Sequence, residues 1–513
     1  MKTALKSKCA VFFALMMILT LGMNSALACT SIYVGSALTA DGSTIFGRSE
    51  DYANSQNKLF YVSPAGNHTA GEEYAGCYGF TYTFTHDSYA YTAYSDDNGA
   101  GVEYVCPDCG GTHKHTPYEA AGTNSMGLTV TATETLYCSE AMEAADPYED
   151  LGIEEAEIVT VLLSEAATAQ EALALLTGIY DTAGANAGSG LFIADSSETW
   201  YIENLTGHQY LAVKLPDDLV LAQPNMSILG LIDLDDGENV IASANLIAVA
   251  QQAGTLVGDA AENQINYVAS YYGDTTPNAR MLNALAYLDP AYAEESAVTA
   301  DAYLITNVGA DGQIAPMHTG IHLAEKMSIA DVQNFYHIAS IGYVRNLETH
   351  IFQIAGEDTV EWVAMNDTAL SVFVPYYPTL TTAVADSYQL STAEAEFVEE
   401  APAEGVYYKT TATKRIDGQR VTVDGYKVLP VNWADSFYWS FDALSNLVMY
   451  GELDEAQVSA VYDAVYAKQS QVNEAFDALD KSGLTAEAAT AFSMQIAQEV
   501  QQFAVDTVNG LTK

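Results

Sequence analysis

The hydrophobic pattern of the chain changes character at residue 28. Up to that point, a basic start leads into an apolar run over 10–22 and then the small-x-small tail Ala26-Leu27-Ala28. This order is typical of a cleaved secretory leader, and the run is too short to span a membrane. β-rich sequence begins directly after Cys29. We therefore expect cleavage between Ala28 and Cys29, and a secreted or extracytoplasmic (cell envelope) location for the remainder.

The first predicted element of the exported part is a β-hairpin. Residues 32–34 and 44–46 are β-rich runs, and the Asp41-Gly42 dipeptide between them is a strong turn signal. The second run leads on to Arg48 and Asp51. Because the two strands of a hairpin are antiparallel, the sequence places both side chains beside the start of the first strand.

Periodicities further along the chain predict a mixture of strands and helices. The predicted elements are a half-buried strand over 80–84, two helices over 153–180 with the capping box Thr168-x-x-Glu171 opening the second, a meander of short strands over 191–222, and helices over 241–252 and from 453 onward. The alanine-rich amphipathic segment 456–511 serves either internal packing or a homo-oligomer contact. The acidic stretch 393–404 is expected to be a linker or an exposed loop.

Charge narrows the range of partners. The formal net charge is −49, and removing residues 1–28, which hold three lysines and no acidic residue, makes it −52. Nucleic acids and anionic membranes are bound through Lys and Arg, of which the chain has only 18. We therefore expect no nucleic-acid partner and, after leader cleavage, no membrane partner.

Cleavage after Ala28 would place two reactive groups on one residue. Cys29 would carry both its thiol and a free α-amine, which can take the proton from its own side chain. Free α-amine and thiol pKa values lie near 8 and 8.5, so modest shifts make both groups usable near neutral pH. A guanidinium such as Arg48 favours the thiolate, and a carboxylate such as Asp51 can orient the α-ammonium.

Two other interpretations of Cys29 stay open. A lipid-modified Cys29 would make the chain an anchored, non-catalytic surface binding protein. That processing signal normally has a large aliphatic residue where Ala26 stands, and a strand instead of a flexible tether follows Cys29. Cys29 could also be a disulfide partner. The mature chain keeps five cysteines, and this odd count predicts two disulfides and one free thiol.

The segment from Ala28 to Tyr52 resembles the start of the exported dipeptidases (dipeptidase A type) of the N-terminal-nucleophile (Ntn) cysteine hydrolases. Relatives of that family cleave penicillin V and bile salts. Later segments that resemble family motifs follow in order at 124–135, 195–203, 221–225, 345–353 and 371–377. The resemblance implies an α+β fold, the four-layer αββα Ntn-hydrolase sandwich with additional C-terminal helices. It divides the chain into a signal peptide (1–28), a hydrolase domain (29–400) and a mainly helical extension packed on the same domain (401–513).

The resemblance also implies an activity, namely hydrolysis of dipeptides through an acyl-enzyme without a cofactor. The same chemistry on another amide, of the penicillin V or bile-salt type, is the alternative. Its implied catalytic residues are Cys29, Arg48, Asp51, Asn225 and Arg280, with Glu134 binding substrate.

Three of these residues have competing interpretations. Asn225 ends a strand where the superfamily places an oxyanion donor, but Asn after Pro224 is also a common turn residue. Glu134 stands where amidase relatives have Asn, and a carboxylate there can pair with the α-ammonium of a dipeptide; otherwise it is a surface acid. Arg280 corresponds to a late active-site Arg or is an ordinary helix-surface residue.

One insertion invites a metal assignment. It contains the pattern C-x2-C-x3-H-x-H, formed by Cys106, Cys109, His113 and His115. These four side chains are zinc ligands by type, but their spacing matches no standard structural zinc module. In an oxidising compartment the two cysteines more simply form disulfides, with each other or with Cys77 and Cys138. We therefore predict no metal at the active site and leave zinc in the insertion open.

Overall fold

The computed structural model describes residues 29–511 except 53–56, 98–102, 106–111, 115, 339, 392–394, 417–418 and 452. The predicted leader and its cleavage junction on the Ala28 side therefore lie outside the described residues. So do Cys106, Cys109 and His115 of the insertion and the side chain of His113. Among the described residues, no helix is both long and apolar enough to cross a membrane.

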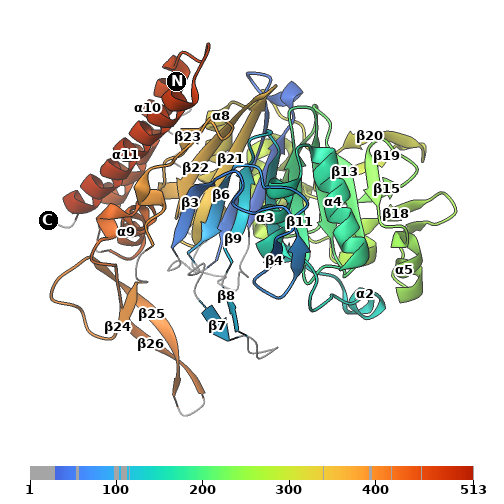
Figure 1. Ribbon diagram of the computed structural model, residues 1–513, viewed down its shortest axis with the longest axis horizontal. Coiled ribbons are helices and arrows are strands. Elements are labelled where there is room, and N and C mark those ends of the chain that lie inside the picture. The colour runs from blue at the N-terminus through green and yellow to red at the C-terminus, as the bar shows by residue number, and fades with distance from the viewer. Residues whose placement is uncertain are drawn as a thin grey trace.

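Two antiparallel sheets form the centre of the molecule (Figure 1). The six-stranded sheet has the order β14 (Val220–Gln223), β1 (Thr30–Val34), β2 (Thr44–Asp51), β21 (Asn346–Ala355), β22 (Asp358–Met365) and β23 (Val374–Tyr376). The eight-stranded sheet has the order β16 (Val240–Ala242), β13 (Tyr210–Lys214), β12 (Thr199–Asn204), β11 (Gly188–Ala194), β10 (Thr129–Leu136), β9 (Tyr118–Thr123), β6 (Tyr91–Asp96) and β3 (Lys58–Ser63).

Aromatic side chains join the two sheets face to face. Phe46 of β2 stacks on Phe192 of β11 with ring centroids 5.7 Å apart, and Phe60 of β3 meets Tyr376 of β23 at 5.0 Å. These rings belong to one apolar cluster that includes both sheets. Burial of this aromatic surface stabilises the sandwich, since each large ring removes 150–250 Å² from water.

Helices cover the outer face of each sheet. The helices α3 (Glu155–Glu165) and α4 (Ala169–Thr182) share a second apolar cluster with the eight-stranded sheet. Next to the six-stranded sheet lie α9 (Phe437–Tyr450), α10 (Glu455–Ala478) and α11 (Ala486–Leu511), where Phe476 of α10 meets Trp362 of β22 at 4.9 Å. The layers are thus helix, sheet, sheet and helix, which confirms the predicted α+β four-layer class.

Smaller elements surround this core. The remaining helices are α2 (Glu140–Ala145), α5 (Leu246–Ala253), α6 (Ala279–Leu288), α7 (Ala300–Tyr303) and α8 (Ile329–Tyr336). The small sheets are β15–β18–β17 (Leu231–Asp233, Gln264–Asn266, Gly258–Asp259), β19–β20 (Thr306–Val308, Ile314–His318), β4–β5 (Glu73–Ala75, Thr81–Thr83), β7–β8 (Glu103–Val105, Thr112–Lys114) and β24–β26–β25 (Glu396–Val398, Gln419–Val428, Tyr407–Ile416), of which the last projects from the body (Figure 1). Single turns are 3₁₀ at Ser36–Leu38, Pro290–Tyr292, Glu295–Ala297, Thr368–Leu370, Asp386–Tyr388 and Trp433–Asp435, and π at Val268–Tyr272.

The structure corrects two predicted elements. The segment 241–252 is not helical from its start, because β16 first pairs with β13 and α5 begins only at Leu246. The acidic stretch 393–404 is not simply a loop, because Glu396–Val398 pairs with the edge of β26. In both places the segment pairs with the edge of a neighbouring strand. The periodicity of the local sequence does not reveal such a neighbour.

The expectation of two disulfides stays a prediction, because Cys106 and Cys109 lie outside the described residues. Cys138 is a free thiol. Cys77 lies against Thr116, with its Sγ 3.1 Å from the threonine hydroxyl. Cys138 has no sulfur partner among the residues that the structure describes.

The carboxyl of Glu361 makes the stability of the sandwich sensitive to pH. Glu361 lies fully buried on β22, and burial raises its pKa to about 8. The folded state therefore holds a proton that the unfolded state releases above about pH 4.5, so this group lowers stability as the pH rises from there to about 8. We expect Glu361→Gln to weaken the fall in unfolding free energy between pH 5 and 8.

Urea unfolding across this pH range measures the effect. At pH 8 the Glu361→Gln variant should be more stable than the wild type by at least about 1 kcal/mol. The exposed Glu171→Gln variant is the matched control and should follow the wild type. A Glu361→Gln profile parallel to the wild-type profile would contradict the prediction.

Candidate active site

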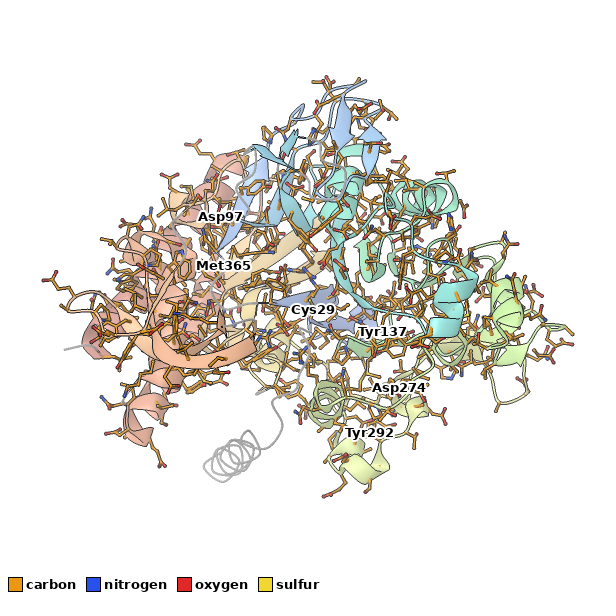
Figure 2. The ribbon with its side chains drawn as sticks, turned by 90° about the horizontal axis from the view of Figure 1, so that it is seen from below. Cys29, Asp97, Tyr137, Asp274, Tyr292 and Met365 are labelled. Carbon is orange, nitrogen blue, oxygen red and sulfur yellow. The ribbon has the colours of Figure 1, made fainter. Side chains whose placement is uncertain are left out.

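Cys29 lies in the middle of the molecule, directly before β1 (Figure 2). The strand β1 is flanked by β14 and β2, so the residue that precedes it is surrounded by sheet on both sides. Cys29 is buried, with 4% of its surface exposed. The residue predicted to be the nucleophile is thus held in place by the central strand that follows it.

Arg48 reaches Cys29 from the neighbouring strand, as the hairpin predicted. It lies opposite Ser31, and its Nη1 is 3.7 Å from the Cys29 Sγ. The same Nη1 donates to Glu155 Oε1 at 2.8 Å, and Nη2 donates to Glu50 Oε2 at 3.1 Å. The two carboxylates fix the plane of the guanidinium, which is itself only 1% exposed.

A buried lysine extends this ion-pair network. Lys58 on β3 donates to both oxygens of Glu50, at 2.6 and 2.7 Å, and to Asp96 at 2.8 Å. Alternating charges therefore run from Asp96 through Lys58, Glu50 and Arg48 to the thiol. Charges this deeply buried are tolerated only when they are paired and hydrogen-bonded.

Burial and the charge of Arg48 act on the pKa of the Cys29 thiol in opposite directions, and burial has the larger effect. It raises the pKa of Cys29 to about 12, although the charge of Arg48 pulls that pKa down. Within the described part of the chain, Arg48 is the only side chain that hydrogen-bonds Sγ, and it is a donor. Deprotonation thus requires a base that arrives with Cys29 itself or from outside the described residues.

Asp51 and Arg280 form a second ion pair next to Cys29. Arg280 Nη2 lies 3.1 Å from Asp51 Oδ2, and its Nη1 donates to the backbone carbonyl of Cys29 at 3.5 Å. Asn346 Nδ2 donates to the other oxygen of Asp51. Arg280 is only 7% exposed, so it is not an ordinary helix-surface residue. Asp51 is thus linked to the backbone of Cys29 through Arg280.

The environment of Asp51 favours a carboxyl that titrates near neutrality. Burial raises its pKa to about 7, against the opposing effects of Arg280 and Asn346. An ammonium group brought close to Asp51 would stabilise the carboxylate further.

Asn225 is placed on the other side of the nucleophile. β14 pairs with β1 so that Gln223 lies opposite Ser31, and continuing this register by two residues sets Asn225 opposite Cys29. Its φ of 50° is left-handed, a conformation that Asn tolerates better than most residues. The strand end predicted for the oxyanion donor therefore belongs to the strand next to β1, on the side away from β2.

Asn278 clamps the Asn225 loop to the helix that carries Arg280. Its Nδ2 donates to the carbonyl of Pro224 at 2.7 Å. Its Oδ1 accepts from the backbone N–H groups of Arg280 at 3.1 Å and Met281 at 3.0 Å, which caps α6. One side chain thereby sets the relative position of two predicted site residues.

Glu203 holds the other end of the same loop. Its carboxylate accepts from the hydroxyl of Ser227 at 2.5 Å and from the backbone N–H of Ile228 at 2.8 Å.

Glu134 reaches the site through a β-bulge. The register between β10 and β11 shifts between Thr133 and Leu136, and bulges commonly redirect side chains next to active sites. The backbone N–H of Glu134 donates to Glu155 Oε2 at 2.8 Å, and Glu155 in turn binds Arg48. Partial desolvation and then the charge of Glu155 raise the pKa of Glu134 to about 7. The exposed side chain of Glu134 is therefore separated from Arg48 by a single residue, Glu155, which bonds to both.

Sequence reasoning missed the residues that support this site, above all Glu155, Lys58 and Asn278. Glu155 looks like an ordinary acidic residue in the first turn of a helix, and it is 107 residues from Arg48 along the chain. Asn278 carried one usable signal, since Asn before a helical segment is a common N-cap.

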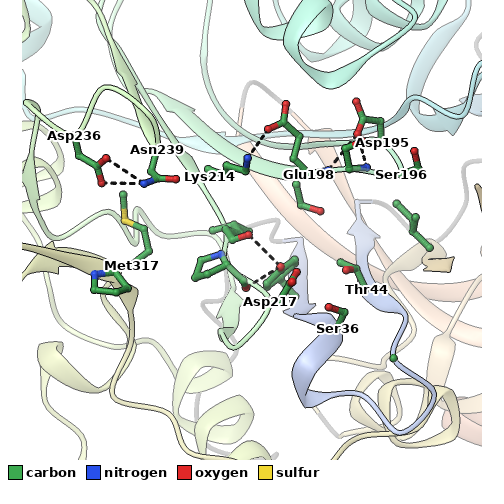
Figure 3. A pocket seen from close by; sticks show the side chains of 18 of the residues that line it. Ser36, Thr44, Asp195, Ser196, Glu198, Lys214, Asp217, Asp236, Asn239 and Met317 are labelled. Carbon is green, nitrogen blue, oxygen red and sulfur yellow. Dashed lines mark hydrogen bonds and ion pairs between the residues drawn. The ribbon is translucent and has the colours of Figure 1, made fainter. Parts of the chain in front are cut away.

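A surface cleft lies away from these residues. This cleft of about 800 Å³ is lined by Tyr33, Thr44, Glu198 and Lys214 among others (Figure 3), and none of the six predicted site residues lines it. Tyr33 is four residues from Cys29 along β1, a separation of about 13 Å. In the described part of the chain, no group of three or more His, Cys, Asp or Glu side chains is arranged to hold a metal ion.

The arrangement suits acyl transfer to a thiol, and Asn278 offers a test of how the oxyanion side is positioned. In Asn278→Asp the side chain still caps α6 but can no longer donate to Pro224. We expect kcat for amide hydrolysis to fall at least about tenfold, since losing an oxyanion donor outright costs about 10² to 10³, while KM and the thermal midpoint stay close to wild type.

The control is Asn278→Ala, which loses both the clamp and the cap. It should additionally lose about 1 kcal/mol of stability. If Asn278→Asp keeps its kcat, Asn278 is a helix cap and nothing more.

Comparison with known proteins supplies the family. The model of peptidase family C69 matches residues 28–302, more than half of the chain. A probable dipeptidase from Salmonella dublin is 30% identical over 390 residues, which cover 70% of this chain and 82% of that protein. A probable dipeptidase B from Streptococcus pyogenes serotype M1 is 37% identical over 227 residues, 44% of this chain. The match spans only 43% of the length of this streptococcal relative.

Among solved structures, penicillin V acylase from Agrobacterium tumefaciens overlaps 68% of this chain and 86% of its own, at 14% identity and a TM-score of 0.27. So loose an overlap adds nothing to the layer order described above. The part that matches the family contains Cys29, Arg48, Asp51, Asn225 and Arg280. The chain belongs to peptidase family C69.

Proposed function

We propose that the protein is an exported dipeptidase whose nucleophile is Cys29, exposed as the N-terminal residue by cleavage after Ala28. The observation that carries the proposal is the convergence on this one residue: Arg48 contacts its thiol and Arg280 its carbonyl. The high thiol pKa supports a base on the same residue, because no described side chain accepts a proton from Sγ.

The reaction then uses the groups around Cys29 in turn. The α-amine takes the thiol proton, and the thiolate attacks the scissile carbonyl of the substrate. Asn225, together with backbone N–H groups, stabilises the negative oxygen of the tetrahedral intermediate. The α-ammonium, oriented by the Asp51–Arg280 pair, gives its proton to the leaving amine. Water then attacks the thioester with the α-amine again as base, which releases the acid and restores the thiol.

Dipeptides are proposed as substrates for two reasons. The relatives from Salmonella dublin and Streptococcus pyogenes are named probable dipeptidases. In addition, Glu134 offers an exposed carboxyl next to the ion pairs of Arg48, where it can bind the free α-ammonium that every dipeptide carries.

The cleavage junction can be tested on the exported protein. We expect its intact mass and N-terminal sequence to begin at an unmodified Cys29, and we expect both Cys29→Ala and Cys29→Ser to lose hydrolysis of dipeptides by at least about 10³-fold. A diacylated Cys29 would instead support the anchored binding protein and refute the mechanism.

Glu134 can be tested with paired substrates. Glu134→Gln should lower kcat/KM for a free dipeptide by roughly tenfold or more, since it removes a charge-assisted pair, and should change hydrolysis of the N-acetylated dipeptide little. The neighbouring Glu140→Gln, exposed at the start of α2, is the control. If Glu134→Gln keeps the wild-type preference for the free amine, Glu134 does not bind the α-ammonium of the substrate. Penicillin V and conjugated bile salts are assayed alongside, because they are the substrates of the alternative amidase activity.

A further inference from the structure

Four carboxyl groups lie at and near the N-terminus of α3, and among the described residues only Glu155 of the four forms an ion pair. Glu154 is the N-cap of α3, and Glu155 and Glu157 follow in the first turn. Glu155 is paired with Arg48, and Glu157 accepts from the backbone N–H groups of Cys77 at 2.8 Å and Glu154 at 3.2 Å. Glu134 joins the group through its bond to Glu155. Helix N-termini favour acids, but they do not require this many at one place.

Glu154 is the member of this group with a carboxyl oxygen that has no hydrogen-bond partner. Its side chain is 3% exposed, and one carboxyl oxygen accepts from the N–H of Glu157 in a capping box. The other, Oε1, is buried with no hydrogen-bond partner in the structure. No lysine or arginine of the described chain forms an ion pair with it. A buried unpartnered carboxyl oxygen costs free energy and indicates a missing donor.

The charges around Glu154 favour a cation as the missing partner. Burial and then the charges of Glu157, Glu134 and Glu155 raise the pKa of Glu154 to about 9. Each of these neighbours is an acid, so a positive group placed among them would stabilise all four carboxylates together.

Two tyrosine rings border the group. Tyr118 donates its hydroxyl to Glu155 Oε2 at 3.1 Å. Tyr78 is 55% exposed and directly follows Cys77, whose backbone N–H donates to Glu157. Aromatic rings with carboxylates suit an ammonium or guanidinium on an apolar stem.

We propose that Glu154, with Glu134 and Tyr78, forms a subsite for the cationic side chain of a substrate's N-terminal residue. This inference rests on the proposed dipeptidase function and names its preferred substrate class, dipeptides that begin with Lys or Arg. Glu134 binds the α-ammonium, the stem of the side chain passes Tyr78, and its charged end meets Glu154 Oε1. Glu134 bonds to Glu155, and Glu155 bonds to Arg48, which contacts the Cys29 thiol. A substrate bound at Glu134 would therefore have its scissile carbonyl near Cys29.

The test compares two substrates that differ in one charge. Lysyl-alanine and norleucyl-alanine have side chains of similar length, and only the first carries the ammonium. We expect the wild type to favour lysyl-alanine by at least about tenfold in kcat/KM, and Glu154→Gln to lose most of that ratio. Gln keeps an acceptor for the capping box, which protects α3. Glu171→Gln, a matched acid near the start of α4, should keep the wild-type ratio.

The outcomes separate the two claims. A wild type that hydrolyses both dipeptides at similar kcat/KM, or a Glu154→Gln variant that keeps the wild-type ratio, would overturn the subsite alone. If Glu154→Gln does not fold, the subsite is tested by two other measurements. One is the kcat/KM ratio of the wild type for the two substrates, and the other is the same ratio for Tyr78→Leu, which should be lower than that of the wild type. A wild type that hydrolyses neither substrate overturns the dipeptidase function. Calorimetric binding of lysyl-alanine in preference to norleucyl-alanine would then still support the subsite, and equal or absent binding would refute it.

Discussion

The site is organised around the buried charge of Arg48. A guanidinium that is 1% exposed is stable only because Glu50 and Glu155 bind it, with Glu348 3.9 Å away. Lys58 in turn satisfies Glu50 and Asp96. This ion-pair network sets the position of the Cys29 thiol and, through the second oxygen of Glu155, that of Glu134. Loss of one partner would leave a bare charge in the centre of the sandwich.

The fold brings these groups together from distant parts of the chain. The hairpin β1–β2 supplies Cys29, Arg48 and Asp51, whereas β3 supplies Lys58 and α3 supplies Glu155. The opposite side is built by β14 and α6, joined by Asn278. The charged groups around the thiol therefore come from strands and a helix, and such elements keep the geometry of a site more constant than loops do.

The sequence allowed the local part of this arrangement to be predicted. A strong Asp-Gly turn between two β-rich runs defined the hairpin, and the hairpin alone placed Arg48 beside Cys29. The resemblance to the family pointed to Asn225 and Arg280. Lys58 and Glu155 could not be predicted, because their partners depend on the order of strands in two sheets and on how those sheets stack. The size of the shift in the thiol pKa could not be predicted for a related reason, since burial is a property of the whole fold.

The central claim is that the base belongs to Cys29 itself. The most direct measurement compares a chain that begins at Cys29 with one that retains Ala28, both otherwise identical, by the rate of Cys29 alkylation with iodoacetamide between pH 5 and 10. We predict that the chain beginning at Cys29 reacts readily near neutral pH, with an inflection well below 12, because its free α-amine takes the thiol proton. The chain that retains Ala28 should react slowly until high pH. Equal rates and equal pH profiles would show that the thiol is activated by another group and would contradict the mechanism.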